Sequence, residues 1–188
     1  MTGNTDQSTV SSDAAVPNRL TRTIALVGMM GAGKSTVGRK LAQVLGADFV
    51  DSDEEIERAA GLSIPEIFAQ HGEAEFRRGE RRVIERLLAG PPIVLATGGG
   101  AYLDPETRDL LRRRAVTVWV RANIETLWKR VSRRRNRPLL EQPDPKQALM
   151  DIYEARKDIY ALADLVVDSA DGPASDVVDA ICEALERT

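Results

Sequence analysis

The chain has 188 residues, of which 43% are hydrophobic and 29% are charged, as is ordinary for a globular domain with one core. A single cysteine excludes an internal disulfide and fits a reducing compartment, and no apolar run approaches the roughly 18 residues that cross a bilayer. We therefore expect a cytoplasmic protein without a membrane partner; its net charge is −3.

The first residues differ in composition from the rest. Residues 1–18 contain six Ser or Thr, two Asp and no Lys or Arg, and they lack the basic start and apolar middle of a secretory signal. Such a segment cannot bury enough apolar surface to offset the entropy lost on ordering. We therefore expect a disordered tail over 1–20 and a single folded domain over 21–188.

Short apolar runs alternate with helical patterns along this domain, which predicts a parallel sheet covered by helices. The expected strands are Thr23–Val27, Asp48–Val50, Ile93–Ala96, Val116–Val120 and Leu165–Val167. The expected helices begin near residues 33 and 63 and cover about 73–88, 104–114, 123–132, 145–160 and 175–187. In the first helix, one face is expected to bury four apolar residues. They are Val37, Leu41, Val44 and Leu45.

The stretch "GMMGAGKST", residues 28–36, follows the first expected strand and begins the first helix. It matches the G-x-x-x-x-G-K-[ST] pattern of a phosphate-binding loop in the strand–helix context that the pattern requires. Backbone N–H groups would surround phosphate oxygens, Lys34 would reach the β- and γ-phosphates, and Ser35 would bind Mg²⁺. The expected ATP contacts in the loop are Gly28, Met30, Gly31, Ala32, Gly33, Lys34, Ser35 and Thr36.

Magnesium requires a carboxylate in addition to Ser35. Asp51 follows the second expected strand and is the best-placed acid, because the strand 93–96 ends without one. Asp53 would project from the same edge and on the same side by strand alternation. The alternative is that these aspartates cap the helix that begins near Glu54.

Two interruptions stand out beside the regular elements. Gly98-Gly99-Gly100 directly follows a strand, at the edge where ligands bind in open α/β sheets. "SRRRNRPLLEQPDP", from Ser132, breaks a helix and predicts a mobile lid over about 132–143. Residues 112–137 carry a charge of +9, which suits nucleic acid, an acidic membrane or nucleotide phosphates. The block contains only two aromatic residues, which disfavours a single-strand platform.

These features together resemble the shikimate kinase family, a branch of the nucleoside monophosphate kinase-like P-loop proteins. The resemblance covers about residues 22–187. It rests on "GMMGAGKST", "DSD" (51–53), "GEAEFRRGE" (72–80), "TGGGA" (97–101), "RPLL" (137–140) and "ARKDIY" (155–160). It implies a three-layer P-loop kinase fold, with a five-stranded parallel sheet, helices on both faces and a mobile lid. The implied reaction phosphorylates the 3-hydroxyl of shikimate with ATP and Mg²⁺, a step of aromatic amino acid biosynthesis.

The resemblance also implies roles for the residues that bind shikimate, in a segment of about 53–82 and beyond. Arg77 and Arg156 match arginines that hold the shikimate carboxylate, and Glu80 would hold Arg77 at i,i+3 spacing. Asp53 would orient the reacting hydroxyl and accept its proton. The neighbouring Arg81 is expected on a solvated helix face. The full expected substrate set is Asp53, Arg77, Gly98, Gly99, Gly100 and Arg156.

On the nucleotide side, Arg137 matches the lid arginine that reaches the transferring phosphate. Arg130 and Pro173 match residues that flank the adenine on its two sides. The catalytic residues expected in this way are Lys34, Asp53 and Arg137, with Ser35 and Asp51 as metal ligands. The arginine that often precedes the proline in this family is missing here, which leaves base selectivity open.

Other functions remain open on the residues alone. A kinase of the same fold could act on gluconate or a nucleoside monophosphate, and a P-loop ATPase stimulated by nucleic acid would use the +9 block. A nucleotide-binding regulator without transfer activity is a third. A guanine switch is disfavoured because neither D-x-x-G nor N-K-x-D occurs in the sequence. We expect a monomer that binds shikimate and no nucleic acid.

Overall fold

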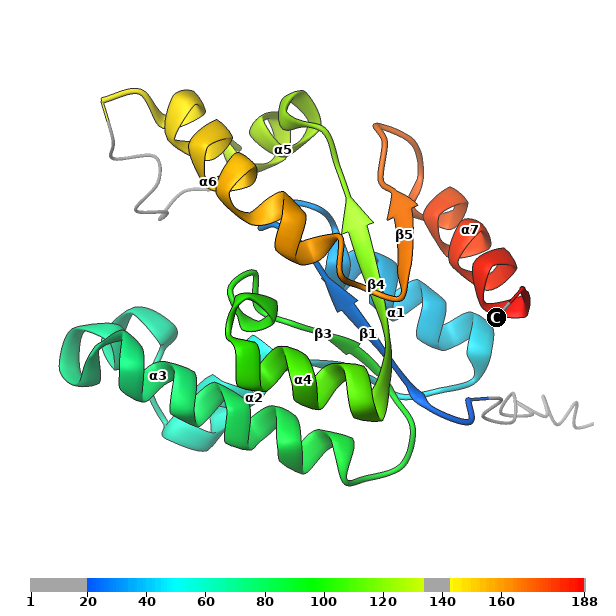
Figure 1. Cartoon of the computed structure of the whole chain (residues 1–188), viewed down its shortest axis with the longest axis horizontal. Coiled ribbons are helices and arrows are strands. Elements are labelled where there is room, and N and C mark those ends of the chain that lie inside the picture. The colour runs from blue at the N-terminus through cyan, green and yellow to red at the C-terminus, as the bar shows by residue number, and fades with distance from the viewer. Residues whose placement is uncertain (1–19, 134–142, 188) are drawn as a thin grey trace, which may run out of the picture.

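The structure is a computed structural model that describes residues 20–133 and 143–187. Five parallel strands form one sheet in the order β2-β3-β1-β4-β5, of which Figure 1 labels β3, β1, β4 and β5. The strands are β1 (Thr23–Val27), β2 (Phe49–Asp51), β3 (Val94–Ala96), β4 (Ala115–Arg121) and β5 (Leu165–Asp168). All five predicted strands are confirmed to within two residues. Arg137 and the lid residues 134–142 lie outside the described residues, as do residues 1–19 of the predicted tail.

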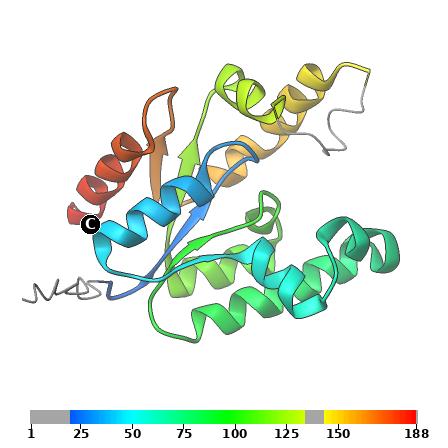
Figure 2. The same cartoon turned by 180° about the vertical axis from the view of Figure 1, so that it is seen from behind.

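Helices cover both faces of this sheet. They are α1 (Lys34–Leu45), α2 (Ser52–Ala60), α3 (Ile64–Leu88), α4 (Pro105–Arg114), α5 (Ile124–Val131), α6 (Pro145–Tyr160) and α7 (Ala174–Glu186), with a 3₁₀ turn η1 (Ala101–Leu103). Helices α4 and α6 lie on the face toward the viewer in Figure 1, and α1 and α7 lie on the opposite face, which Figure 2 shows. The predicted three-layer fold is confirmed.

The central strand β1 explains why its sequence reads as a continuous apolar run. Every residue of β1 is buried, because β3 and β4 flank it and helices cover both faces. Parallel pairing also brings the carboxyl ends of β1, β2 and β3 to one edge of the sheet. The phosphate-binding loop, the aspartate segment and the glycine turn follow those three ends, so they meet there.

Helix α1 buries a slightly different face from the one predicted. Val37 and Leu41 are buried as expected, but Val44 is 57% exposed, so that part of the prediction is wrong. At 100° per residue, the buried arc also includes Gly38 and Ala42, and its centre is displaced from Val44. Because Gly38 has no side chain, the ring of Phe49 on β2 approaches α1 closely. A prediction based only on apolar side chains does not count glycine as part of the buried face.

Helix α3 is kinked, which agrees with the two helical segments predicted for it. Its start is the predicted capping box, in which the Glu66 carboxylate accepts a hydrogen bond of 2.8 Å from the Ser63 N–H. The kink lies at Gly72, whose φ of 75° and ψ of 173° are not helical. The second segment begins after this glycine and carries Arg77 and Glu80 toward the sheet edge.

Candidate active site

The phosphate-binding loop joins β1 to α1 through glycines in backbone conformations that other residues avoid. Gly28 has a φ of 131°, and an added Cβ would lie 2.8 Å from the carbonyl oxygen of Val120. Gly33 has a φ of 98° and forms the N-terminal boundary of α1, whose first turn contains no acidic residue. The first N–H groups of α1 and its helix dipole therefore favour an anion at this point.

Lys34 and Arg130 hold this loop from two sides. The Lys34 ammonium donates to the carbonyl oxygens of Gly28 at 2.8 Å and Met29 at 2.9 Å. Arg130, on α5, donates to the carbonyl oxygen of Ala32 at 3.1 Å and to Ser169 Oγ at 3.0 Å. Both cations thus lie against the loop, where the phosphates of a bound nucleotide would become additional hydrogen-bond acceptors for them.

A cleft of about 830 Å³ opens over the loop. The predicted residues that line it are Met30, Gly31, Gly33, Lys34, Ser35, Thr36, Asp51, Asp53, Gly99 and Arg130. The predicted residues that do not line it are Gly28, Ala32, Arg77, Gly98, Gly100, Arg156 and Pro173. Pro173 is exposed, but its neighbours Gly172 and Ala174 line the cleft. The end of the cleft predicted to hold the adenine is therefore bordered by these two neighbours and not by Pro173 itself.

Ser35 and Asp51 lie together, as the predicted metal site requires. The Ser35 hydroxyl donates to Asp51 Oδ2 at 2.7 Å, while Asp51 Oδ1 accepts from the Asp53 N–H at 3.0 Å. No group of three His, Cys, Asp or Glu side chains in the described segments forms a metal cage. Two oxygen ligands suit Mg²⁺, which retains waters and takes further oxygens from substrate phosphates.

The position of Asp53 corrects one step of the sequence reasoning. Asp53 lies in the first turn of α2, and the cap of that helix is Asp51. Strand alternation therefore does not place Asp53, because the strand has already ended at Asp51. Its carboxylate still reaches the cleft, and the helix start rather than the strand directs it there.

The environment of Asp53 is unusual for a carboxylate. Burial and the negative charge of Asp51 raise the pKa of Asp53 from 3.8 to about 6, although Lys34 and Arg77 oppose the rise. Gly98 allows this close approach, since an added Cβ there would lie 2.5 Å from Asp53 Oδ1. A carboxylate of this kind can hold or accept a proton near neutral pH.

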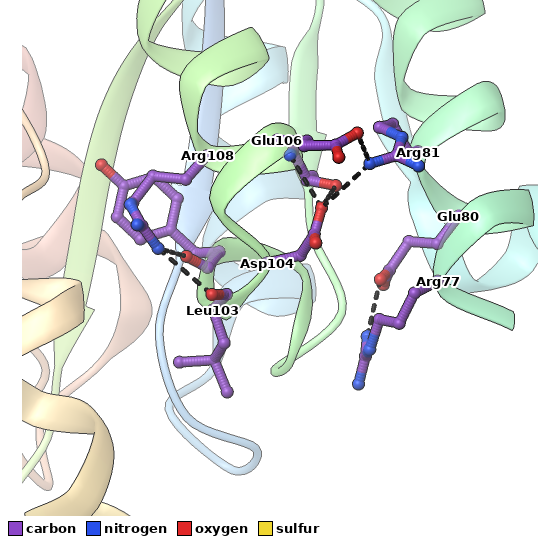
Figure 3. Close-up of polar contacts among 9 residues, drawn as sticks. Arg77, Glu80, Arg81, Leu103, Asp104, Glu106 and Arg108 are labelled. Atoms are coloured by element: carbon purple, nitrogen blue, oxygen red, sulfur yellow. Dashed lines mark hydrogen bonds and ion pairs between the residues drawn. The ribbon is translucent and has the colours of Figure 1, made fainter. Parts of the chain in front are cut away.

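The predicted pair of Arg77 and Glu80 is confirmed, and Figure 3 shows both side chains. Arg77 Nη1 donates to Glu80 Oε2 at 2.6 Å, and Glu80 is only 1% exposed. Desolvation raises the pKa of Glu80, and the positive charge of Arg77 opposes that rise. The second carboxylate oxygen has no hydrogen-bond partner in the described part of the chain. The buried carboxylate thus fixes the guanidinium, while the Arg77 side chain remains one-quarter exposed.

The neighbouring Arg81 is not the solvated residue that was predicted. It forms ion pairs with Asp104, at 3.7 Å, and with Glu106 (Figure 3). Both acids belong to the start of α4, so Arg81 connects α3 to the segment that follows the glycine turn. The sequence pattern could not reveal this, because the partners are more than twenty positions away.

The glycine turn lies between the two halves of the site. A Cβ added to Gly99 would lie 3.4 Å from the backbone nitrogen of Met30, so the turn touches the phosphate-binding loop. A Cβ on Gly100 would lie 2.8 Å from Cζ of Arg77. On the other side, Arg156 lies beside the hydroxyl of Tyr160, which contacts the turn. The glycine turn therefore lies next to the phosphate-binding loop, to Arg77 and to Tyr160 with its neighbour Arg156.

Two polar residues at the site were missed in the sequence. Ser52 is fully buried, and its Oγ accepts a hydrogen bond of 3.1 Å from the Gly98 N–H. Thr97 is also buried and donates to the carbonyl oxygen of Leu26 at 3.0 Å. A small polar residue inside the "DSD" segment was the available signal for Ser52. Its hydrogen-bond partner, Gly98, lies 46 positions away, so this hydrogen bond could not be predicted from the sequence.

The fold described above also occurs in a solved kinase. A gluconokinase from Sinorhizobium meliloti is 22% identical to this chain with a TM-score of 0.61, covering 88% of this chain and 92% of its own, which shows the fold alone.

No helix in residues 20–133 and 143–187 has both the length and the apolar character needed to span a bilayer.

Closer similarities identify the family. Residues 30–186 match the family model described as shikimate kinase. The shikimate kinase of Paramagnetospirillum magneticum is 56% identical over 89% of this chain and 86% of its own length, and that of Caulobacter vibrioides is 53% identical over 95% and 88%. A solved shikimate kinase from Acinetobacter baumannii in complex with shikimate is 41% identical with a TM-score of 0.83, covering 88% of this chain and 93% of its own. The chain belongs to the shikimate kinase family.

Proposed function

We propose that this chain transfers the γ-phosphoryl group of ATP to the 3-hydroxyl of shikimate, giving shikimate 3-phosphate and ADP. The observation that carries the proposal is the close approach of the phosphate-binding loop to the glycine turn beside Arg77. A donor phosphate on the loop and an acceptor against the turn would therefore be neighbours. Phosphoryl transfer depends mainly on such positioning and on stabilisation of charge.

The donor half consists of the loop, α1 and α5. Loop N–H groups and Lys34 would bind the β- and γ-phosphates, and Arg130 would border the nucleotide. Ser35 and Asp51 would hold Mg²⁺, which neutralises charge on the phosphates when it is bound. Pro173 would lie near the base. Arg137 would contribute a further positive charge to the transferring group, as the family pattern implies.

The acceptor half requires groups for a carboxylate and for hydroxyls. Arg77 and Arg156 would bind the shikimate carboxylate, because a guanidinium offers paired N–H donors in one plane. Glu80 keeps the Arg77 guanidinium in place. Gly99 and Gly100 would provide backbone donors, with Gly98 leaving room for Asp53.

Asp53 is proposed to act on the reacting hydroxyl. As the oxygen–phosphorus bond forms and the bond from the γ-phosphorus to ADP breaks, the hydroxyl proton would pass to the Asp53 carboxylate. The raised pKa of Asp53 makes it a better proton acceptor than an ordinary aspartate. In a loose transition state little proton transfer is needed early, so orientation of the hydroxyl is the larger contribution of Asp53.

The test is ADP release in separate reactions with shikimate, gluconate, quinate, AMP and RNA. Release that depends on shikimate supports the proposal, and its absence beside activity on another acceptor would overturn it. Arg77→Ala and Arg156→Ala should weaken shikimate binding by roughly 10- to 150-fold, as for the loss of a charged hydrogen bond. ATP binding should change little. Arg78→Ala is the matched control, because Arg78 lies on the same helix and is exposed.

We further propose that the protein works as a cytoplasmic monomer that recognises no nucleic acid. Light scattering at increasing protein concentration, with and without substrates, measures the oligomeric state. A dimer that forms only with shikimate would contradict this part of the proposal.

A further inference from the structure

Tyr160 ends α6 and lies directly behind the glycine turn. Its side chain is completely buried, and its ring centre is 6.0 Å from that of Trp119 on β4. The Tyr160 hydroxyl donates a hydrogen bond to the carbonyl oxygen of Gly99, with 2.5 Å between the two oxygens. The Tyr160 side chain has no exposed surface, so it does not face a ligand in the open site. Its hydroxyl therefore acts on the turn.

The planar peptide bond gives this contact a consequence for the site. In a trans peptide the carbonyl of Gly99 and the N–H of Gly100 point in opposite directions, and the structure contains no cis peptide in its described residues. With the carbonyl held on Tyr160, the Gly100 N–H is directed away from Tyr160. Neither the Gly99 nor the Gly100 N–H donates to any atom in segments 20–133 and 143–187. Both donors are thus available to a ligand.

The same hydroxyl has neighbours from the two other parts of the site. Arg156 lies one helical turn before Tyr160 on α6, and its guanidinium is beside the hydroxyl. Met29 Sδ, at the start of the phosphate-binding loop, is 3.9 Å from the hydroxyl oxygen. The buried Tyr160 hydroxyl therefore lies next to the glycine turn, Arg156 and the phosphate-binding loop.

We propose that Tyr160 is a positioning residue for the phosphoryl acceptor. Its hydroxyl fixes the orientation of the Gly99–Gly100 peptide and the place of Arg156 relative to it, so that backbone donors and guanidinium bind one acceptor together. The inference rests on the proposed role of Gly99, Gly100 and Arg156 in binding shikimate. Burial raises the pKa of Tyr160, so the hydroxyl keeps its proton and remains a donor throughout the neutral range.

Tyr160→Phe tests the proposal because it removes one oxygen and leaves the buried ring. We expect the KM and the dissociation constant for shikimate to rise about tenfold, and kcat to fall by a similar factor, because a misplaced acceptor loses contacts in both states. The dissociation constant for ATP should stay within about twofold. Steady-state kinetics, calorimetric titration and thermal melting measure these quantities.

Tyr102→Phe is the matched control. Tyr102 is also completely buried, and its hydroxyl lies beside Thr117 on β4, so its removal should leave both substrate affinities unchanged. A double-mutant cycle of Tyr160→Phe with Arg156→Ala should be non-additive for shikimate binding, since the two groups act on one acceptor. Arg156→Ala alone reports whether the underlying acceptor site is correctly assigned.

Three outcomes would overturn the role of Tyr160. They are unchanged shikimate affinity in Tyr160→Phe, equal losses for ATP and shikimate with a lower melting temperature, and additive effects in the cycle. The second result would mean that the hydroxyl only stabilises the fold. If the wild-type protein phosphorylates shikimate and Arg156→Ala impairs it while Tyr160→Phe does not, the proposed function stands and only this inference fails.

Discussion

Gly100→Ala should damage the acceptor half of the site without touching the nucleotide half. Gly100 has a φ of −96° and a ψ of −12°, a negative-φ conformation that other residues also adopt in turns, so the backbone does not require glycine. The new Cβ, however, would lie 2.8 Å from Cζ and 2.9 Å from Nη1 of Arg77. These atoms belong to the end of a flexible side chain, so the guanidinium would move and the protein would still fold.

The size of the effect follows from what Arg77 loses. A displaced guanidinium no longer aligns with a bound carboxylate, and a charged hydrogen bond is worth about 1.5–3 kcal/mol. The dissociation constant for shikimate should therefore increase by roughly 10- to 150-fold. Arg77 would also be pulled from Glu80, whose buried carboxylate has no second hydrogen-bond partner in the described residues. The melting temperature should fall modestly for this reason.

Calorimetric titration with shikimate and with ATP measures the effect. Gly79→Ala is the control, because Gly79 lies on the same helix as Arg77 and an added Cβ would meet no atom within 4 Å. That variant should keep both affinities and gain about 0.5–1 kcal/mol of stability from the helix interior. Normal shikimate affinity in Gly100→Ala, or an equal loss of ATP affinity, would refute the steric reasoning.

Three further outcomes are expected. The folded-state pKa of Asp53 is raised from 3.8 to about 6, so its ionisation lowers the stability of the fold progressively between those pH values and fully above about 6. Asp53→Asn should therefore raise the melting temperature at about pH 8 and not at about pH 4, and the wild-type kcat/KM should fall as pH drops through 6. A melting curve without this pH difference would contradict the buried environment. Ser35→Ala should raise the Mg²⁺ concentration for half-maximal rate about tenfold, measured by titrating Mg²⁺ in the ADP assay, and an unchanged requirement would remove Ser35 from the metal site. Leu41→Ala should cost about 2–5 kcal/mol in urea unfolding, whereas Val44→Ala should cost less than about 0.5 kcal/mol; similar losses would contradict the exposure of Val44.

The elements that depend on local pattern were predictable. Each of these elements is determined by residues that are close neighbours in the sequence. They are the buried strand before "GMMGAGKST", the glycines that follow it and the capping box at Ser63. The pair of Arg77 and Glu80 also followed from helical spacing. For these features the chain carries both partners of an interaction close together.

The predictions were wrong where a residue's environment depends on residues that are far away in the sequence. Val44 is exposed because α1 turns Gly38 and Ala42 toward its neighbours, and Arg81 is paired because α4 begins beside α3. Asp53 reaches the cleft from a helix rather than a strand, since Asp51 already serves as the cap. Small residues and long-range ion pairs have no periodic signal in the sequence.

The sequence by itself determined the phosphate-binding loop, because this loop is one continuous turn whose N–H groups, lysine and serine are adjacent in the chain. The tertiary structure alone decided how the acceptor half is held. Tyr160 reaches Gly99 across 61 positions, and Ser52 reaches Gly98 across 46. Those contacts exist only because parallel strands and the helices on them bring separate segments to one edge of the sheet.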